Sequence, residues 1–329
     1  MKTKILLSVL ACFVLSTMAV QKAFSQLKGD KLLGGIGLDA GSQAPPETFT
    51  LAVPFYFYDA GSLKNANGNT SIVSPNLNVF ITALGGTYVS NAKIFGATYG
   101  ASILLPFIQN RIQGNNVDSK SSFAFTDIYF QPVQLGWRTK TADFVFNYSV
   151  YIPTGSYELG GSSNSGLGMF TNEFSGGTTI RLDPKGSIAF STLLSYEIHD
   201  DKKNTDIKPG DIFSIEGGLG KTWYTFNGSK IPSSIIKWGI IYYAQFKATD
   251  DQLPGQTVIP ALNNNSTIYL PGRDHIYALG LEGNVLLTKS RMLLGVRWFD
   301  EFSAVNRFQG NTAFITVAHI FSTAPKKKE

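Results

Sequence analysis

Residues 143–153 read Asp-Phe-Val-Phe-Asn-Tyr-Ser-Val-Tyr-Ile-Pro, and this stretch decides the fold. One set of alternating positions is apolar or aromatic: Phe144, Phe146, Tyr148, Val150 and Ile152. The intervening set is Asp143, Val145, Asn147, Ser149 and Tyr151, in which every side chain but that of Val145 carries a polar group. Successive side chains of a strand point to opposite faces. The stretch therefore predicts a strand with one face suited to lipid and the other suited to water.

Segments of this kind recur along the chain, each of roughly ten residues and each ended by a turn. We expect twelve strands, near Phe49–Tyr58, Leu77–Val89, Lys93–Phe107, Phe123–Trp137, Asp143–Pro153, Met169–Arg181, Ser187–Ile198, Ile212–Trp223, Ile236–Thr249, His275–Leu287, Met292–Phe302 and Asn311–Phe321. No apolar run after the first 25 residues approaches the ~20 residues that a spanning helix needs. The pattern predicts an all-β protein, an antiparallel transmembrane β-barrel of about 12 strands over residues 49–321.

The connections between these strands alternate in length. Every odd connection is polar: Asp59–Asn76, Ile108–Ser122, Thr154–Gly168, His199–Asp211, Asp250–Asp274 and Ser303–Gly310. The even ones are mostly tight: Ser90–Ala92, Arg138–Ala142, Leu182–Gly186 and Thr288–Arg291, with Tyr224–Ile235 as the exception. Outer-membrane barrels have short periplasmic turns and longer outside loops. A soluble β-sandwich, the main alternative fold, has no reason to sort its loops in this way.

The first 25 residues resemble a cleavable signal peptide. Lys2 and Lys4 precede an apolar run, and Ala23-Phe24-Ser25 supplies the small residues of a cleavage site before Gln26. Cys12 is the only cysteine, so cleavage leaves no thiol and no disulfide; a lipoprotein anchor at Cys12 is a minor alternative. We expect export and a location in the outer membrane of a Gram-negative bacterium. The short basic tail, residues 322–329, is expected to be solvated, without binding nucleic acid.

Residues 26–48 precede the first strand and contain Leu32, Leu33, Ile36 and Leu38, which would be poorly placed in open periplasm. We expect this segment to fold into the lumen of the barrel and narrow it. A disordered tail, as chain termini often are, is an equally open alternative.

The parity of the strands predicts which side chains line the lumen. The expected lining residues are Asp127, Gln131, Asn147, Glu173, Arg181, Glu197, Glu216, Gln245, Lys247, Glu282, Arg297 and Glu301, with Asn284, Tyr129, Tyr151, Tyr243 and Phe299 among them. Charges of both signs in a narrow lumen must pair, because an unpaired buried charge costs several kcal/mol. Two roles stay open for them: tying the barrel wall together, which we favour, and contacting a substrate.

A family resemblance is carried by motifs in the middle of the chain. Asp127, Pro132 and Leu135-Gly136-Trp137 are followed by Ile152-Pro153-Thr154-Gly155-Ser156-Tyr157, Asn164 and Gly166, and later by Tyr196, Gln245, Thr249-Asp250-Asp251, Asn306-Arg307 and Gln309-Gly310. Over roughly Phe123–Phe321 the chain resembles the outer-membrane family named for the meta-pathway of phenol degradation. The resemblance marks Pro153, Thr154, Gly155, Tyr157, Asp250 and Asp251 as family motif residues. It implies a barrel that helps hydrophobic or aromatic compounds cross the outer membrane.

The favoured function is therefore a channel or transporter for uptake of small apolar or aromatic solutes. Its expected partners are outer-membrane lipid and lipopolysaccharide, the barrel-assembly machinery and the solute itself. A non-transporting surface or adhesive protein is one alternative, and a barrel-embedded lipid-modifying enzyme is a remote one. The histidines His199, His275 and His319 lie beside no nucleophile motif. We expect no catalysis, no cofactor and no bound metal, although Asp250-Asp251 and His199-Asp200-Asp201 could hold a divalent cation.

Overall fold

The computed structural model describes residues 28–72, 74–114, 117–159, 161, 163–253 and 272–322. These residues form fourteen strands: β1 (Thr48–Leu63), β2 (Asn76–Ile94), β3 (Ala97–Gly114), β4 (Val117–Lys120), β5 (Ala124–Phe125), β6 (Ile128–Arg138), β7 (Ala142–Ile152), β8 (Thr171–Arg181), β9 (Ile188–His199), β10 (Ile212–Thr225), β11 (Ser234–Lys247), β12 (His275–Leu287), β13 (Met292–Val305) and β14 (Phe308–Ser322). Within the same residues, no helix is long and apolar enough to cross a membrane. The expected signal peptide, residues 1–25, and most of the basic tail lie outside the described residues.

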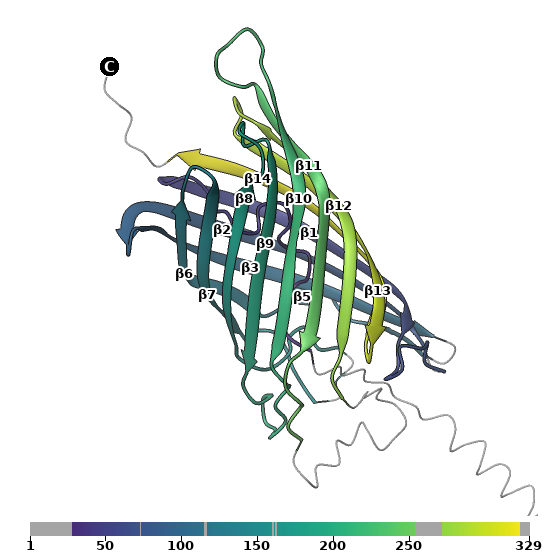
Figure 1. Cartoon of the computed structure of the whole chain (residues 1–329). Coiled ribbons are helices and arrows are strands. Elements are labelled where there is room, and N and C mark those ends of the chain that lie inside the picture. The colour runs from purple at the N-terminus through teal and green to yellow at the C-terminus, as the bar shows by residue number, and fades with distance from the viewer. Residues whose placement is uncertain are drawn as a thin grey trace, which may run out of the picture.

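The strands close into a barrel (Figure 1). Neighbours along the chain pair antiparallel, and β1 pairs with β14 over almost its whole length, from Thr48 opposite Ser322 to Leu63 opposite Phe308. The short β4 and β5 pair only with β3, so twelve of the described strands make up the wall. The predicted fold class, an antiparallel barrel of about 12 strands, is confirmed.

The two faces of each strand differ in burial as the alternation predicts. In β7, Asp143, Asn147 and Ser149 are buried, whereas Phe144 and Phe146 are 46% and 42% exposed. In a closed barrel the buried positions face the interior and the exposed ones face outward. The outward wall carries exposed Phe, Leu, Ile and Trp side chains on every long strand, which is the surface that lipid requires.

Three predicted connections are wrong in detail. Most of the connection expected at Ile108–Ser122 is strand, because β3 continues to Gly114 and β4 covers Val117–Lys120. The tight turn expected at Ser90–Ala92 lies within β2, which continues to Ile94, and the chain reverses at Phe95 and Gly96, both at positive φ. The loop expected at Ser303–Gly310 is a two-residue turn at Asn306 and Arg307 between β13 and β14. The remaining odd connections are longer than the tight even ones, and we call their end of the barrel the long-connection end.

These errors share a physical cause. Apolar alternation marks only the lipid-facing part of a strand, whereas cross-strand hydrogen bonds continue wherever two chains stay side by side. The β3 strand, for example, runs to Gly114 and pairs with β4 at polar positions such as Arg111 opposite Lys120. Pairing beyond the apolar segment leaves little signal in the sequence.

A pair of arginine substitutions tests the lipid-facing wall. Phe146→Arg places a charge in the middle of an outward face and should lower the free energy of unfolding by about 2–4 kcal/mol. Asn311→Arg lies at an exposed, polar outward position in β14 and should cost about 0–1 kcal/mol. The measurement is a refolding titration in lipid vesicles, and equal costs at the two positions would contradict the assigned faces.

Candidate functional site

The barrel interior is occupied by the chain itself. Residues 28–47 have no regular structure and run inside the wall. Near β1 the segment lies at the end with tight turns, where the Arg138 side chain donates a 2.8 Å hydrogen bond to the Gln43 carbonyl. Its other end lies near the long-connection end, where Thr171, the first residue of β8, donates to the Asp30 carboxylate at 2.5 Å. Residues 28–47 therefore pass through the lumen lengthwise, and we call them the lumen segment.

Three inward-facing glutamates satisfy the backbone of the lumen segment. Glu197 of β9 accepts hydrogen bonds from the amides of Asp30 and Lys31, both at 3.0 Å. Further along, Glu216 of β10 accepts one from Ile36 at 3.2 Å, and Glu282 of β12 accepts one from Leu38 at 2.8 Å. A segment without secondary structure leaves its amides unpaired, and buried amides need partners. The glutamates supply these partners.

The Lys31 side chain of the same segment forms ion pairs with two glutamates of the wall. The Lys31 ammonium lies 3.3 Å from Glu173 and 3.1 Å from Glu216, and all three side chains are at most 7% exposed. On the facing wall, Arg297 of β13 lies 3.1 Å from Glu282 and donates a 2.8 Å hydrogen bond to the Gly35 carbonyl. Arg297 is thus the cation that compensates the charge of Glu282.

The lumen segment approaches the wall more closely than any side chain would allow at two positions. A Cβ added to Gly37 would overlap the Glu282 carboxylate, and one added to Gly41 would overlap the backbone of Thr178 in β8. Only glycine fits where backbone lies against backbone or against a fixed carboxylate. The segment and the wall therefore fit closely against each other at these two glycines.

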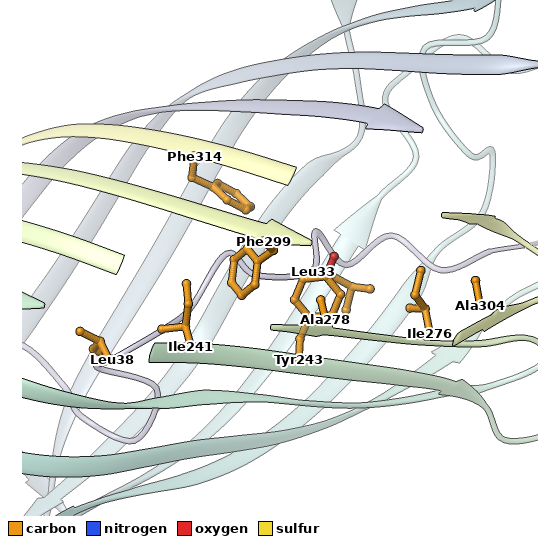
Figure 2. Packing of buried hydrophobic residues seen from close by; sticks show 9 residues of the cluster. All are labelled: Leu33, Leu38, Ile241, Tyr243, Ile276, Ala278, Phe299, Ala304 and Phe314. Carbon is orange, nitrogen blue, oxygen red and sulfur yellow. The ribbon is translucent and has the colours of Figure 1, made fainter. Parts of the chain in front are cut away.

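An apolar wall lines one side of the lumen (Figure 2). Leu33 and Leu38 of the lumen segment pack in one cluster with inward-facing residues of β11, β12, β13 and β14: Ile241, Tyr243, Ile276, Ala278, Phe299, Ala304 and Phe314. Both leucines are buried, at 7% and 3% exposure. Burying a leucine side chain is worth about 1.5–3 kcal/mol, so these contacts hold the segment in addition to its polar bonds.

The opposite wall is polar. Gln131 of β6 donates to Asn147 of β7 at 3.1 Å, and Asn147 donates to Ser175 of β8 at 3.0 Å. All three side chains are buried. This chain of amides ties three neighbouring strands together, and Glu173, Glu197 and Glu216 continue the polar face onto β8, β9 and β10.

Eleven of the twelve expected lining residues lie at inward-facing positions of strands. The lumen segment is held by Glu173, Glu197, Glu216, Glu282 and Arg297, a role that was not predicted from the sequence. Gln131 and Asn147 tie the wall.

The other expected lining residues lie near the two ends of the barrel or within the apolar wall. Arg181 lies 2.8 Å from Asp143 at the tight-turn end, and Lys247 lies 2.9 Å from Asp251 at the other. Gln245 accepts a 2.8 Å hydrogen bond from Arg307. Glu301 accepts hydrogen bonds from the hydroxyls of Tyr58 and Tyr243, at 2.8 and 2.7 Å, and from the Gly310 amide at 2.8 Å. Buried carboxylates that accept several hydrogen bonds can be accommodated in an apolar wall.

Asp127 precedes β6 and organises the connection between β7 and β8. Its carboxylate accepts hydrogen bonds from the amides of Gly155 and Leu167 at 2.9 and 2.6 Å. Burial raises the pKa of Asp127, while these two hydrogen bonds act in the opposite direction. This residue fixes a connection and lies outside the strand positions that face the lumen segment.

The family motif residues lie in connections of the long-connection end, between β7 and β8 and between β11 and β12. Thr154, which follows Pro153 after β7, donates a 2.8 Å hydrogen bond to the Thr126 carbonyl. The ring of Tyr157 lies 5.0 Å from the Lys202 ammonium, which is buried and whose pKa is lowered by that burial to about 8. Asp250 pairs with Arg273 at 2.9 Å. These contacts, with the Lys247–Asp251 pair, occupy the carboxylates of Asp250 and Asp251, two of the groups considered above as cation ligands.

Several residues of the site were missed from the sequence. Lys31, Asp30 and Asp143 carry the polar contacts of the lumen segment and the tight-turn end. Arg307 and Asp274 form a 3.1 Å pair near Gln245. The one available signal was Lys31 itself, because a lone lysine beside Leu32 and Leu33 needs a partner wherever those leucines are buried.

The three histidines lie apart from one another. His199 is buried, with its Nδ1 3.0 Å from the Gly210 carbonyl. His275 packs against Phe246 and Tyr277, and His319 packs against Phe321. These contacts are aromatic and backbone contacts, and they do not assemble a serine and a histidine in the described residues.

Comparison with known proteins places the sequence in a family. Residues 60–317 match the family described as "Putative MetA-pathway of phenol degradation". The chain belongs to this family. The match spans β1 to β14 and includes the motif residues Pro153, Thr154, Gly155, Tyr157, Asp250 and Asp251. No functionally curated protein matches the chain in sequence.

One solved structure shows the same architecture, and two others resemble the chain more distantly. An outer membrane channel from Pseudomonas putida F1 superposes with a TM-score of 0.68 at 13% identity, covering 88% of this chain and 100% of that one. The β domain of the Bordetella autotransporter BrkA gives a TM-score of 0.48 at 12% identity, covering 84% and 100%. A Pseudomonas aeruginosa FadL homologue gives 0.36 at 8% identity, covering 84% and 90%. The first of these shows that the fold of this family member is that of an outer-membrane β-barrel.

Removing the lysine of the lumen segment should loosen it. Lys31→Met leaves Glu173 and Glu216 without their cation. Loss of one partner of a buried ion pair destabilises the folded arrangement by about 3–5 kcal/mol. The matched control is Lys237→Met, whose pair with Asp39 is more exposed and should be worth at most about 1 kcal/mol. Hydrogen exchange at the amides of residues 30–40 measures the difference, and equal protection in both variants would contradict the assigned role of Lys31.

Proposed function

We propose that this protein is an outer-membrane channel for small apolar or aromatic molecules, and that the lumen segment covers their route. The apolar wall of the lumen carries the proposal. Tyr243, Phe299 and Phe314 present aromatic surface to the barrel interior, where a porin for sugars or ions would present mainly polar groups. Leu33 and Leu38 occupy this surface in the structure.

The two walls suit different tasks. Apolar and aromatic lining with a few directed polar groups is typical of sites that bind small apolar molecules. The glutamates of the polar wall, Glu173, Glu197 and Glu216, are engaged with backbone amides and with Lys31, so they fix the segment and leave solute contact to the apolar wall. A solute that displaces Leu33 and Leu38 would gain the apolar contacts that these leucines lose.

The name of the family and the outer-membrane fold support the proposal. Phenol degradation requires that a small aromatic compound enters the cell, and the outer leaflet resists apolar solutes. The expected orientation places the long-connection end outside the cell. A non-transporting surface protein is the competing function, and it predicts neither conductance nor solute flux.

Removal of the lumen segment should open the channel. A variant lacking Gln26–Gln43 should show a marked rise in single-channel conductance in planar bilayers, because the lumen loses the chain that fills it. Unchanged conductance would place the segment outside the conducting path.

A reversible lock provides a second test that leaves the chain intact. Asp30→Cys combined with Thr171→Cys introduces two thiols at side chains whose oxygens lie 2.5 Å apart. Oxidation should tie the segment to β8 and stop solute flux, and a reductant should restore it. The two single-cysteine variants are the controls, and a locked protein that still transports would exclude movement of the segment as a step.

The substrate class has its own test. In vesicles that contain the protein, a neutral monocyclic aromatic such as phenol should enter faster, relative to protein-free vesicles, than a sugar of similar size. Phe299→Ser should reduce the excess flux of the aromatic and leave that of the sugar unchanged. Equal excess flux of both solutes would retain a channel but exclude a preference for aromatics.

A further inference from the structure

A continuous polar row crosses the outward wall near the long-connection end. Strand register places Asp300 of β13 opposite Asn311 of β14, Asn311 opposite Asp59 of β1, and Asp59 opposite Asn78 of β2. The row continues through Arg111 of β3 to Lys120 of β4. A row of polar side chains on the lipid-facing side marks the level at which the wall leaves the hydrocarbon.

One step further into the membrane, the next outward row is aromatic. Trp298 lies opposite Ala313, Ala313 opposite Phe57, and Phe57 opposite Phe80. The rings of Phe57 and Phe80 are 5.2 Å apart, and Phe57 and Trp298 are 43% and 48% exposed. Ala313 is the small residue between large rings, so the wall is hollowed there.

The hollow has a volume of about 500 Å³ and is lined from both rows. Phe57, Phe80, Ala313 and Trp298 form its apolar part. Asp59, Asn78, Gln109, Arg111, Asn311 and Lys120 form its polar part. We call it the outer-wall recess.

The polar groups of the recess are available to a ligand. Among the described residues, the side chains of Asn78, Gln109 and Asn311 donate no hydrogen bond, and Lys120 forms no ion pair. Arg111 pairs with Asp118 at 3.0 Å, but both are well exposed, at 43% and 60%. Such an exposed pair is worth at most about 1 kcal/mol and can exchange partners.

We propose that the outer-wall recess binds a phosphorylated glycolipid of the outer leaflet. The aromatic row and Ala313 receive its acyl chains, and the amides and Asp59 bind sugar hydroxyls. Arg111 and Lys120, neighbours across β3 and β4, bind its phosphate. A cationic pair at the boundary of the hydrocarbon suits an anionic headgroup, and three side-chain amides beside it suit a sugar better than a simple phospholipid. This inference rests on the orientation proposed above, with the long-connection end outside the cell, and is independent of transport.

The experiment uses Trp298 as its reporter. A background variant with Trp137→Phe, Trp223→Phe and Trp238→Phe leaves Trp298 as the single tryptophan of the four. Its fluorescence is followed while diphosphorylated lipid A is titrated into the detergent-solubilised full-length protein. Saturable change is expected. Arg111→Ala with Lys120→Ala should weaken the apparent affinity about tenfold, because two charge-assisted contacts are lost.

Control variants distinguish binding at the outer-wall recess from nonspecific attraction between the protein and anionic lipids. Lys64→Ala with Arg273→Ala removes the same charge from connections of the long-connection end and should leave the affinity unchanged. Ala313→Phe fills the recess from an outward position without adding a second tryptophan, and it should abolish saturable binding while the barrel still folds. Equal affinity for phosphatidylglycerol, an anionic lipid without this sugar headgroup, would overturn the glycolipid assignment, and so would an equal loss in the control variant. Unchanged conductance in the Ala313→Phe variant would leave the channel proposal intact.

Discussion

Lipid offers no hydrogen bonds, and the whole architecture follows from this constraint. Every backbone amide of the wall must pair with a neighbouring strand, which a sheet can achieve only by closing on itself. The pairing of β14 with β1 from Thr48 to Leu63 completes this closure and fixes the register in which all other side chains face inward or outward. The separation of apolar outer and polar inner positions depends on that register, because a slip by one residue would reverse every side chain.

The same constraint operates inside the barrel, where the lumen segment has no strand partners. Its amides are satisfied by carboxylates, with Glu197, Glu216 and Glu282 accepting where a neighbouring strand would otherwise do so. Charged acceptors form shorter and stronger hydrogen bonds than carbonyls, but they also need compensation, which Lys31 and Arg297 provide. A wall made only of strand-to-strand contacts would not need three buried glutamates at these positions, so their presence is explained by the segment they hold.

The sequence predicts the strands of the wall far better than it predicts the contacts of the lumen segment inside the barrel. Alternation of two residues is a local signal, and it located all twelve strands, with β12 matching at both ends. The predicted connections were wrong at Ser90–Ala92, Ile108–Ser122 and Ser303–Gly310 because polar hairpins extend beyond the lipid-facing segment. Inward orientation of Glu197 and Glu282 could be read from parity, but their partners Lys31 and Leu38 lie more than 160 residues away in the sequence. No local pattern encodes such pairings, which arise only once the barrel has closed.

Amphipathic character recurs at three levels of this structure and links the wall to the proposed function. Each strand divides lipid from the interior, and the interior in turn divides into the polar wall of β6–β10 and the apolar wall of β11–β14. The lumen segment matches this second division, since Lys31 faces the glutamates while Leu33 and Leu38 pack against Phe299 and its neighbours. Its polar bonds fix its position along the barrel, whereas its leucines cover apolar surface that is costly to leave in water. An apolar solute can take the place of the leucine side chains against the apolar wall. It cannot donate the hydrogen bonds that the backbone amides of the segment donate to the glutamates. Entry of such a solute would therefore compete with the leucine contacts first, and its passage would then break the hydrogen bonds to Glu197 and Glu282, which a tie between the segment and β8 prevents.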